Sequence, residues 1–244
     1  MQNKLCSITS NQTIVTISNH TKYSIAYFLP DISTSNFKVY YAPLKKYNFV
    51  ESQNDNQQIF NSLCLEHGKY ILLVCGNRHE KGAYRACRVL FSLIENNIRI
   101  PQNIKILVLG ISNFKPYKKL VKGNSQFIFH GYVSTNDLEV LYKNAYLFLY
   151  PTLNEGFGYP PLEAMKYGTL CACSANSAIT EIYGDSVIYF NPFDEIEMCN
   201  RILQCFDEEV RREKSKKIAE RYKLIRERQE NDLSLLIQEI INNV

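Results

Sequence analysis

The sequence predicts an α/β fold built around a doubly wound parallel sheet of six strands. Six short runs after Lys69 are apolar throughout, which is typical of strands that are covered on both faces. Segments with apolar residues at three- and four-residue spacing separate these runs, as the crossover helices of a parallel sheet do. The predicted strands are residues 70–75, 104–109, 127–130, 145–150, 170–173 and 187–190.

The helices between these strands carry their own signatures. Between the first two strands, apolar residues recur at helical spacing from Ala83 to Ile94. Ser134-x-x-Asp137 has the form of a capping box and opens the helix after the third strand. Sheets joined by such right-handed crossovers bind ligands beyond the carboxyl ends of their strands, near the point where the strand order reverses.

The two ends of the chain differ from its middle. We expect a strand at 13–16, a helix at 21–28, a strand at 38–41 and a polar, Asn- and Gln-rich linker at 48–61. These elements are too few to form a domain of their own. Beyond residue 208, apolar residues recur at helical spacing on a charged background, which predicts one or two long amphipathic helices.

Composition and charge exclude several classes of protein. The 244 residues are 45% hydrophobic, 21% charged and 12% aromatic, unlike disordered, fibrous or small disulfide-stapled chains. A chain of this length buries roughly 70–75% of its unfolded surface in one or two domains. The formal charge is +4, and residues 208–230 supply +3 of it with nine basic and six acidic side chains. Because the rest is nearly neutral, we expect no nucleic-acid partner.

Cysteine usage indicates the cytoplasm. The eight cysteines fall mostly within apolar runs rather than in Cys-x-x-Cys pairs, as expected of free thiols that act as small buried hydrophobes in a reducing compartment. No apolar run reaches the roughly 18 residues that span a bilayer. Residues 1–12 lack the charged and hydrophobic regions of a signal peptide.

Several common site motifs are absent. The sequence has no Gly-x-Gly-x-x-Gly, no Gly-x4-Gly-Lys-Ser/Thr, no His-Glu-x-x-His and no Gly-x-Ser-x-Gly. Dinucleotide oxidoreductases, phosphate-loop nucleotidases, zinc proteases and serine hydrolases are therefore disfavoured. No Asp-x-Asp occurs either, which leaves no obvious carboxylate pair to hold a divalent ion on a diphosphate.

The most informative segment is residues 150–168, which leads from a buried strand into a short helix. Two prolines suit the first helical turn, and Gly168 suits the position that ends the helix. Gly156 and Gly158 allow the backbone to approach a ligand closely, and the unpaired N–H groups of the helix start favour negative charge. We therefore expect an anion site at this turn.

Two carboxylates flank the turn, Glu155 in the loop and Glu163 in the expected first helical turn. Each can accept hydrogen bonds from hydroxyl groups of a ligand whose phosphates meet the N–H groups. Taken singly, Glu163 is better explained as a partner of the helix dipole and Glu155 as a solvated loop charge. Their combination with Gly-Phe-Gly and a helix start favours a binding site.

These segments resemble the C-terminal, donor-binding domain of the family 4 retaining glycosyltransferases, within the glycosyl transferases group 1. The resemblance covers about half of the sequence, and its motifs follow the family's order. They are Cys75-Gly-Asn-Arg-His-Glu-Lys-Gly82, His130-Gly-Tyr-Val133, the Glu155-x7-Glu163 pair with its Gly-Phe-Gly turn, Glu163-Ala-Met-Lys-Tyr-Gly168-Thr, and Glu181.

The resemblance implies a GT-B fold and the transfer of a hexose, with retention of configuration, from a nucleotide diphosphate sugar. It implies a glycan or lipid-linked acceptor, cell-envelope polysaccharide biosynthesis, and no cofactor or metal ion, so that fixed cations and N–H groups stabilise the departing diphosphate. The catalytic residues that it implies are Lys81 and Arg78, on the diphosphate, and Glu155, on hydroxyls of the transferred sugar. The implied donor-binding residues are Gly76, Val133 against the base, Gly156, Phe157, Gly158, Leu162, and Glu163 on the ribose.

Two of these assignments have competing explanations from the residues alone. Arg78 lies close enough in sequence to pair with Glu80, and Phe157 can simply pack the turn, with its N–H rather than its ring facing a ligand. Residues 174–178, Ser-Ala-Asn-Ser-Ala, contain no glycine where the family commonly has a glycine-rich turn. This departure leaves the donor specificity open.

The resemblance divides the chain into three parts. Residues 1–65 correspond to a remnant of the N-terminal domain with its linker, residues 66–207 to the nucleotide-sugar donor-binding domain, and residues 208–244 to C-terminal amphipathic helices. Most of the acceptor domain has no counterpart here, so a separate acceptor-domain chain is a further expected partner.

Four hypotheses stay open at this point. The leading one is a glycosyltransferase that works as part of a longer or two-chain enzyme. The second is a catalytically incomplete nucleotide-sugar binding module or subunit. In the third, the basic helices after Glu208 dock the chain on an anionic membrane, at its inner face, or on another protein. A nucleotide-sugar epimerase of similar architecture is the fourth.

Overall fold

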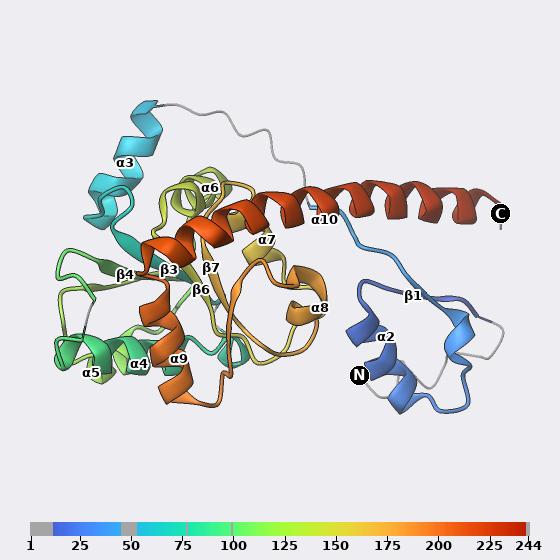
Figure 1. Ribbon diagram of the computed structural model, residues 1–244, viewed down its shortest axis with the longest axis horizontal. Helices are drawn as coiled ribbons and strands as arrows, with labels where there is room; N and C mark the ends of the chain where they lie inside the picture. Colours follow the sequence, from blue (N-terminus) through green and yellow to red (C-terminus); the bar gives the residue numbers. More distant parts are fainter. Residues whose placement is uncertain (1–11, 45–52, 77, 99, 243–244) are drawn as a thin grey trace.

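A six-stranded parallel sheet with helices on both faces forms the centre of the structure (Figure 1). The computed structural model describes residues 12–44, 53–76, 78–98 and 100–242. The strands are β3 (Tyr70–Val74), β4 (Lys105–Leu109), β5 (Phe127–His130), β6 (Leu147–Tyr150), β7 (Cys171–Ser174) and β8 (Ile188–Phe190). All six predicted strands are confirmed to within two residues at each end, and so is the doubly wound sheet.

The strand order is β5-β4-β3-β6-β7-β8. The order therefore reverses between β3 and β6, which are neighbours in the sheet with Ile71 opposite Leu147. The helices that follow these two strands, α4 (Ala83–Glu95) and α7 (Tyr159–Met165), lie on opposite faces of the sheet, and ligands bind at the carboxyl edge of such a reversal. The fold thus places the segments after residues 74 and 150 side by side.

Helices cover both faces of the sheet, which explains why its strands are apolar throughout. One face carries α4 (Ala83–Glu95), α5 (Lys115–Leu120) and α9 (Glu195–Gln204), whereas α6 (Thr135–Asn144), α7 (Tyr159–Met165) and α10 (Glu208–Asn242) lie on the other (Figure 1). The short helix α8 (Ile179–Tyr183) follows β7. Side chains of the central strands, such as Leu72 and Phe148, are fully buried.

The helix starts follow the capping signals in the sequence. Ser134 caps α6 and accepts a hydrogen bond from the Asp137 amide at 3.1 Å, as predicted. Asp194 caps α9 by accepting from the amides of Ile196 and Glu197, each at 3.0 Å. These bonds satisfy N–H groups that have no partner within the helix.

The first part of the chain forms a small unit, which we call the N-terminal unit (residues 12–44). Strands β1 (Ile14–Thr16) and β2 (Phe37–Val39) pair in parallel, and α2 (Asn19–Phe28) and the short 3₁₀ turn η1 (Thr34–Asn36) connect them. Both predicted strands and the predicted helix are confirmed. The helix begins two residues earlier than expected because Ser18 caps it.

The predicted linker at 48–61 is wrong for the part that the structure describes. Residues 53–61 belong to helix α3 (Gln53–Leu63), whereas residues 48–52 lie outside the described residues. Phe60 and Leu63 are buried in the main core, and α3 packs against α6. The Asn- and Gln-rich composition concealed two apolar residues at helical spacing, and their burial overrides weak local propensity.

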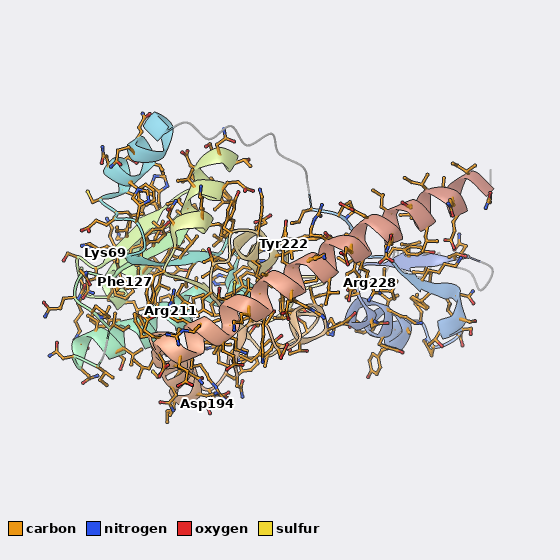
Figure 2. The ribbon with its side chains drawn as sticks, turned by 45° about the horizontal axis from the view of Figure 1, so that its top comes forward. Lys69, Phe127, Asp194, Arg211, Tyr222 and Arg228 are labelled. Carbon is orange, nitrogen blue, oxygen red and sulfur yellow. The ribbon has the colours of Figure 1, made fainter. Side chains whose placement is uncertain are left out.

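The C-terminal helix α10 is one continuous helix of 35 residues, within the predicted range. Ile218 and Ile225 are buried where its first part crosses the sheet domain. Further along, the Gln229 side chain donates to the Ala42 carbonyl at 2.7 Å, so the second part reaches the N-terminal unit. Figure 2 shows this path, with Arg211 near the start of α10 and Arg228 beside the N-terminal unit.

Basic residues of α10 bind partners within the protein itself. Arg211 donates to the Tyr146 carbonyl at 3.1 Å, and its guanidinium lies 3.9 Å from the centre of the Tyr146 ring. Lys217 pairs with Asp185 at 2.8 Å. This engagement reduces the positive charge that α10 offers to a membrane, and docking there stays a prediction. No helix within the described residues is both long and apolar enough to cross a membrane.

Among the described residues, the seven cysteines are free thiols, five of them buried. Burial raises the pKa of the Cys205 thiol to about 12. Such thiols stay protonated and pack as small apolar groups, as expected from the sequence.

The docking of α3 is testable through Phe60. Because its ring is buried, Phe60→Ala is expected to lower the free energy of unfolding by about 3–5 kcal/mol, from lost burial and a residual cavity. Urea denaturation measures the change. Gln57→Ala, on the exposed side of the same helix, is the control and is expected to shift stability by less than about 0.5 kcal/mol. Equal stability of the two variants would mean that α3 is an undocked linker.

Candidate functional site

The candidate site lies where the loops after β3 and β6 touch. The chain leaves β3 through a short 3₁₀ turn, η2 (His79–Lys81), and Gly82 follows with φ of +67°. A Cβ atom at Gly82 would lie 2.0 Å from the Pro151 carbonyl oxygen. Only glycine allows this approach. The Leu153 amide also donates to the Glu80 carbonyl at 2.6 Å, so the two loops form one unit.

Lys81 and Glu155, predicted as catalytic residues, meet at the centre of this unit. The Lys81 ammonium lies 2.5 Å from Oε1 of Glu155. The exposed fractions of the side chains are 7% and 14%, so this ion pair is largely withdrawn from water. An unsupported buried ion pair recovers little of its desolvation penalty. Further hydrogen bonds are therefore required to hold it.

Two hydroxyl groups supply these bonds. Tyr150, the last residue of β6, accepts from Lys81 Nζ at 2.7 Å and donates to Oε1 of Glu155 at 2.7 Å. Thr152 donates to the same carboxylate oxygen at 2.9 Å. Burial, and then the Glu155 charge, raise the pKa of Tyr150 far above its usual range, so its hydroxyl stays a proton donor. Sequence reasoning missed both hydroxyls.

Glu163 lies on α7, in its second turn rather than its first, because the helix already begins at Tyr159. Burial raises the pKa of the Glu163 carboxyl above its ordinary value, and the positive charges of Lys166 and Lys81 oppose this shift. Tyr142 on α6 is its neighbour, and burial followed by the Glu163 charge raise the pKa of the Tyr142 hydroxyl well above its usual range. Glu163 thus shares the electrostatic environment of Lys81.

The Gly-Phe-Gly turn is held tightly between these acids. Gly158 has φ of +88°, and a Cβ there would lie 2.3 Å from Cδ1 of Ile179, so glycine is required at this position. The amides of residues 156–158 donate to no acceptor among the described residues. They remain available to the phosphate oxygens of a ligand, as the sequence predicts. The predicted prolines and Gly168, with φ of +75°, bound α7 as expected.

The structure turns two predicted donor-binding side chains away from a ligand. The Phe157 ring is buried, with its centre 5.1 Å from that of Tyr41 and 4.6 Å from that of Tyr159. Leu162 is fully buried in the core. Both side chains are apolar and pack where water is excluded, so a donor can meet these residues only through their backbone. Their roles stay predictions for the backbone atoms.

Gly76 follows β3 closely, and the side chain of Tyr132, the residue before Val133, reaches toward it from the loop after β5. A Cβ atom at Gly76 would lie 3.9 Å from the Tyr132 hydroxyl, which belongs to the residue before Val133. Val133 is partly buried against the core, whereas Tyr132 is 75% exposed. The contact of Val133 with a base, and the role of Gly76, stay predictions.

Arg78 does not join Lys81 and Glu155. It has extended backbone ahead of η2, is 56% exposed, and its Nε lies 3.6 Å from Glu80. Its side chain lines a hollow of about 210 Å³ with Arg85 and Tyr117, among others, that includes neither Lys81 nor Glu155. The ion pair with Glu80 that the sequence allowed is thus present, and a contact of Arg78 with the diphosphate stays a prediction.

The loop at 174–178, which departs from the family pattern, anchors the Glu155 segment. Ser177 accepts a hydrogen bond from the Glu155 amide at 2.8 Å, and Asn176 donates to the Leu153 carbonyl at 2.5 Å. The Ser174 hydroxyl donates to the Thr152 carbonyl at 2.5 Å. Polar side chains here replace the freedom of glycine with bonds that fix the neighbouring loop. The run of Ser and Asn residues is the sequence signal that could have predicted this anchoring role.

The N-terminal unit docks directly on the Gly-Phe-Gly turn. The Ser18 hydroxyl donates to the Gly156 carbonyl at 2.6 Å, and Ser18 is fully buried. The Glu181 carboxylate accepts from the amides of Asn19 and His20, each at 2.9 Å, at the start of α2. A carboxylate at a helix N-terminus is favoured by the helix dipole. We call this set of bonds the Glu181 clasp.

The assembled groups define a class of chemistry. Lys81 offers a positive charge, residues 156–158 offer N–H groups, and Glu155 and Glu163 offer carboxyl oxygens, which are able to accept hydrogen bonds. Within the described residues, no group of three or more His, Cys, Asp or Glu side chains lies together. Such a site suits a ligand that carries both phosphates and sugar hydroxyls.

The family of the chain agrees with this site. Residues 55–223, more than half of the sequence, match the family model for Glycosyl transferases group 1. The chain belongs to this family of glycosyltransferases.

Two curated relatives are mannosyltransferases of Escherichia coli. The serotype-specific mannosyltransferase WbdA is 40% identical over 80 residues, which are 33% of this chain and 10% of WbdA. The O-antigen chain mannosyltransferase B is 40% identical over 83 residues, which are 34% of this chain and 22% of that protein. The matches therefore span less than a quarter of either relative.

Solved structures share the fold over nearly all of the chain. A glycosyltransferase from Rickettsia africae has a TM-score of 0.80 at 15% identity, over 100% of this chain and 67% of its own. Anabaena Alr3699/HepE, in complex with UDP and glucose, has a TM-score of 0.73 at 14% identity, over 95% of this chain and 64% of its own. The sheet domain is thus the Rossmann-like half of a GT-B fold, as predicted.

The Glu181 clasp is testable by amide hydrogen exchange. Glu181→Gln removes the charge and one of the two acceptor oxygens, so exchange in α2 is expected to accelerate about tenfold, as α2 separates from the turn more often. Glu239→Gln is the control, because it removes an acid that pairs with Lys38 of the N-terminal unit away from the turn. Unchanged exchange in Glu181→Gln would show that α2 does not depend on the clasp.

Proposed function

We propose that this chain is the donor-binding half of a retaining, family 4 glycosyltransferase. It transfers a hexose from a nucleotide diphosphate sugar to a glycan or lipid-linked acceptor in cell-envelope polysaccharide biosynthesis. The observation that carries the proposal is the buried Lys81–Glu155 pair beside Glu163, at the point where the strand order reverses. The mannosyltransferase relatives and the UDP- and glucose-bound neighbour support it.

Each group has a defined task in this reaction. The ammonium of Lys81 and the N–H groups of residues 156–158 neutralise the charge that develops on the diphosphate as its bond to the anomeric carbon breaks. Glu155 accepts a hydrogen bond from a hydroxyl of the transferred sugar and fixes its ring. Glu163 accepts from the ribose hydroxyls. The acceptor oxygen then attacks the anomeric carbon from the face that the diphosphate leaves and gives its proton to an oxygen of the departing diphosphate, so the configuration is retained.

These groups can act without a metal ion, because one fixed cation and several aligned N–H groups already face the diphosphate. Because the matches span only part of the relatives, we propose that the acceptor binds mainly to a further domain, on this chain or on another. Free thiols in the described residues support a cytoplasmic site of action.

The proposed donor site is testable by titration calorimetry with UDP and GDP. The protein is expected to bind at least one of them, with an affinity that EDTA does not change. Glu163→Ala is expected to weaken this binding about 10- to 100-fold, because it removes charge-assisted hydrogen bonds to the ribose. Glu80→Gln removes an acid whose side chain is 47% exposed, and as the control it is expected to change the affinity less than about threefold. Absence of binding by every nucleoside diphosphate would overturn the proposal.

The raised pKa of Glu163 predicts how this binding depends on pH. Only the ionised carboxylate accepts both ribose hydrogen bonds, so affinity is expected to be constant above the pKa of Glu163 and to fall below it. Because burial raises this pKa, the fall begins at a higher pH than for an ordinary glutamate. Titrations of wild type and Glu163→Gln across the acid range measure the effect. The variant is expected to lack this pH dependence, and an identical profile in both proteins would contradict the assignment.

A further inference from the structure

The two oxygens of the Glu155 carboxylate have different surroundings. Oε1 accepts from Lys81 at 2.5 Å, from Tyr150 at 2.7 Å and from Thr152 at 2.9 Å. Oε2 forms no hydrogen bond with any residue in the described part of the chain. A carboxylate oxygen with three donors has little capacity left for a ligand. Oε2 is therefore the oxygen that is free to accept a sugar hydroxyl.

We propose that Tyr150 and Thr152 are positioning residues, whose hydroxyls hold Glu155 so that Oε2 faces the transferred sugar. The inference rests on the proposed function and goes beyond it, because neither hydroxyl is assigned a role by the motifs. Both side chains are fully buried, so they act on a ligand only through Glu155 and Lys81. Tyr150 is the last residue of β6, and Thr152 follows it by two positions.

Tyr150 restricts the geometry of the ion pair between Lys81 and Glu155. Its oxygen accepts one N–H of Lys81 while its O–H is given to Oε1, so both charged groups are held by one atom. Lys81 also lies over the Tyr150 ring, 5.0 Å from its centre. Without this hydroxyl, the carboxylate can turn and offer either oxygen to the ammonium. A sugar hydroxyl would then compete with Lys81 for Oε2.

Thr152 fixes the carboxylate from a second direction. Its hydroxyl is 2.9 Å from Oε1, closer than to the carbonyl oxygens of Glu80 at 3.3 Å and Asn154 at 3.4 Å. With a second hydroxyl donor beside Tyr150 on Oε1, rotation of the carboxylate is restricted further, which limits where Oε2 points.

The same cluster orients the cation. An ammonium group has three N–H donors, and Lys81 gives one to Tyr150 and one to Glu155. One donor is left for a diphosphate. The positions of the diphosphate and of the sugar hydroxyl are therefore set by one rigid unit. Loss of a hydroxyl from this unit is expected to affect the sugar moiety of the donor more than the nucleotide moiety, which also binds Glu163.

The experiment compares the affinity of the full chain for a nucleotide sugar with its affinity for the nucleotide alone. The probes are UDP-glucose with UDP and GDP-mannose with GDP, by calorimetry, and the pair that wild type binds better is used. Tyr150→Phe and Thr152→Val are expected to weaken binding of the nucleotide sugar about tenfold, whereas binding of the nucleotide changes less than about threefold.

Two matched variants control for loss of a buried hydroxyl. Tyr70 lies on β3, next to β6 in the sheet. Tyr70→Phe removes its fully buried hydroxyl, which donates to the Leu141 carbonyl at 2.6 Å. Thr169→Val removes one that donates to the Tyr142 carbonyl at 2.7 Å. Both are expected to leave the ratio of the two affinities unchanged. In a Glu155→Gln background, Tyr150→Phe is expected to have no further effect on this ratio, since its action depends on the Glu155 carboxylate.

The outcomes separate this inference from the proposed function. A ratio in Tyr150→Phe and Thr152→Val equal to that of wild type, or an equal shift in the two controls, would overturn the positioning role. The positioning role would also be overturned if wild type and Glu155→Gln both bound the nucleotide and had the same affinity for the nucleotide sugar. Wild type that binds no nucleotide at all would overturn the proposed function itself.

Discussion

The contact between Lys81 and Glu155 is the constraint on which the rest of the site depends. It joins residues 74 positions apart, and it forms only because β3 and β6 are neighbours at the reversal of strand order. Gly82, in the left-handed backbone conformation, lets the two loops touch. Ser177, in the loop after β7, accepts a hydrogen bond from the Glu155 amide. The sheet, the turn and the polar loop thus converge on one pair of charges.

The pair is buried, and burial decides what it can do. In water such an ion pair contributes little, whereas in a protein interior each charge must be satisfied by partners at hydrogen-bond distance. Tyr150 and Thr152 provide these partners without adding charge. The result is a cation and a carboxylate with fixed directions, ready for a ligand that is itself charged at one end and rich in hydroxyls at the other. Such preorganisation avoids reorganisation during a reaction.

The N-terminal unit is connected to the site rather than merely adjacent to it. Ser18 binds the Gly156 carbonyl, Tyr41 packs on Phe157, and α10 binds both parts of the molecule. Any motion of this unit relative to the sheet domain must therefore break or carry with it the turn between Glu155 and Glu163. The N-terminal unit is thus mechanically coupled to the turn between Glu155 and Glu163.

The strands of the sheet and the order of the motifs could be predicted from local sequence patterns. Continuous apolar runs predict strands because a strand that is covered on both faces needs apolar residues at every position. Glycines at left-handed turns are also local signals. The sequence therefore predicted all six strands, α7 with its flanking Gly158 and Gly168, and the carboxylates of Glu155 and Glu163.

Which side chains meet could be seen only in the folded chain. Arg78 and Lys81 are three residues apart, yet only Lys81 reaches Glu155, because Arg78 precedes the turn in extended backbone. The burial of Phe60 docks a helix in a stretch that is polar in sequence. Tyr150 looks like an ordinary strand residue in sequence, but its hydroxyl binds both Lys81 and Glu155. Burial and contact are properties of the packed chain and not of local sequence pattern.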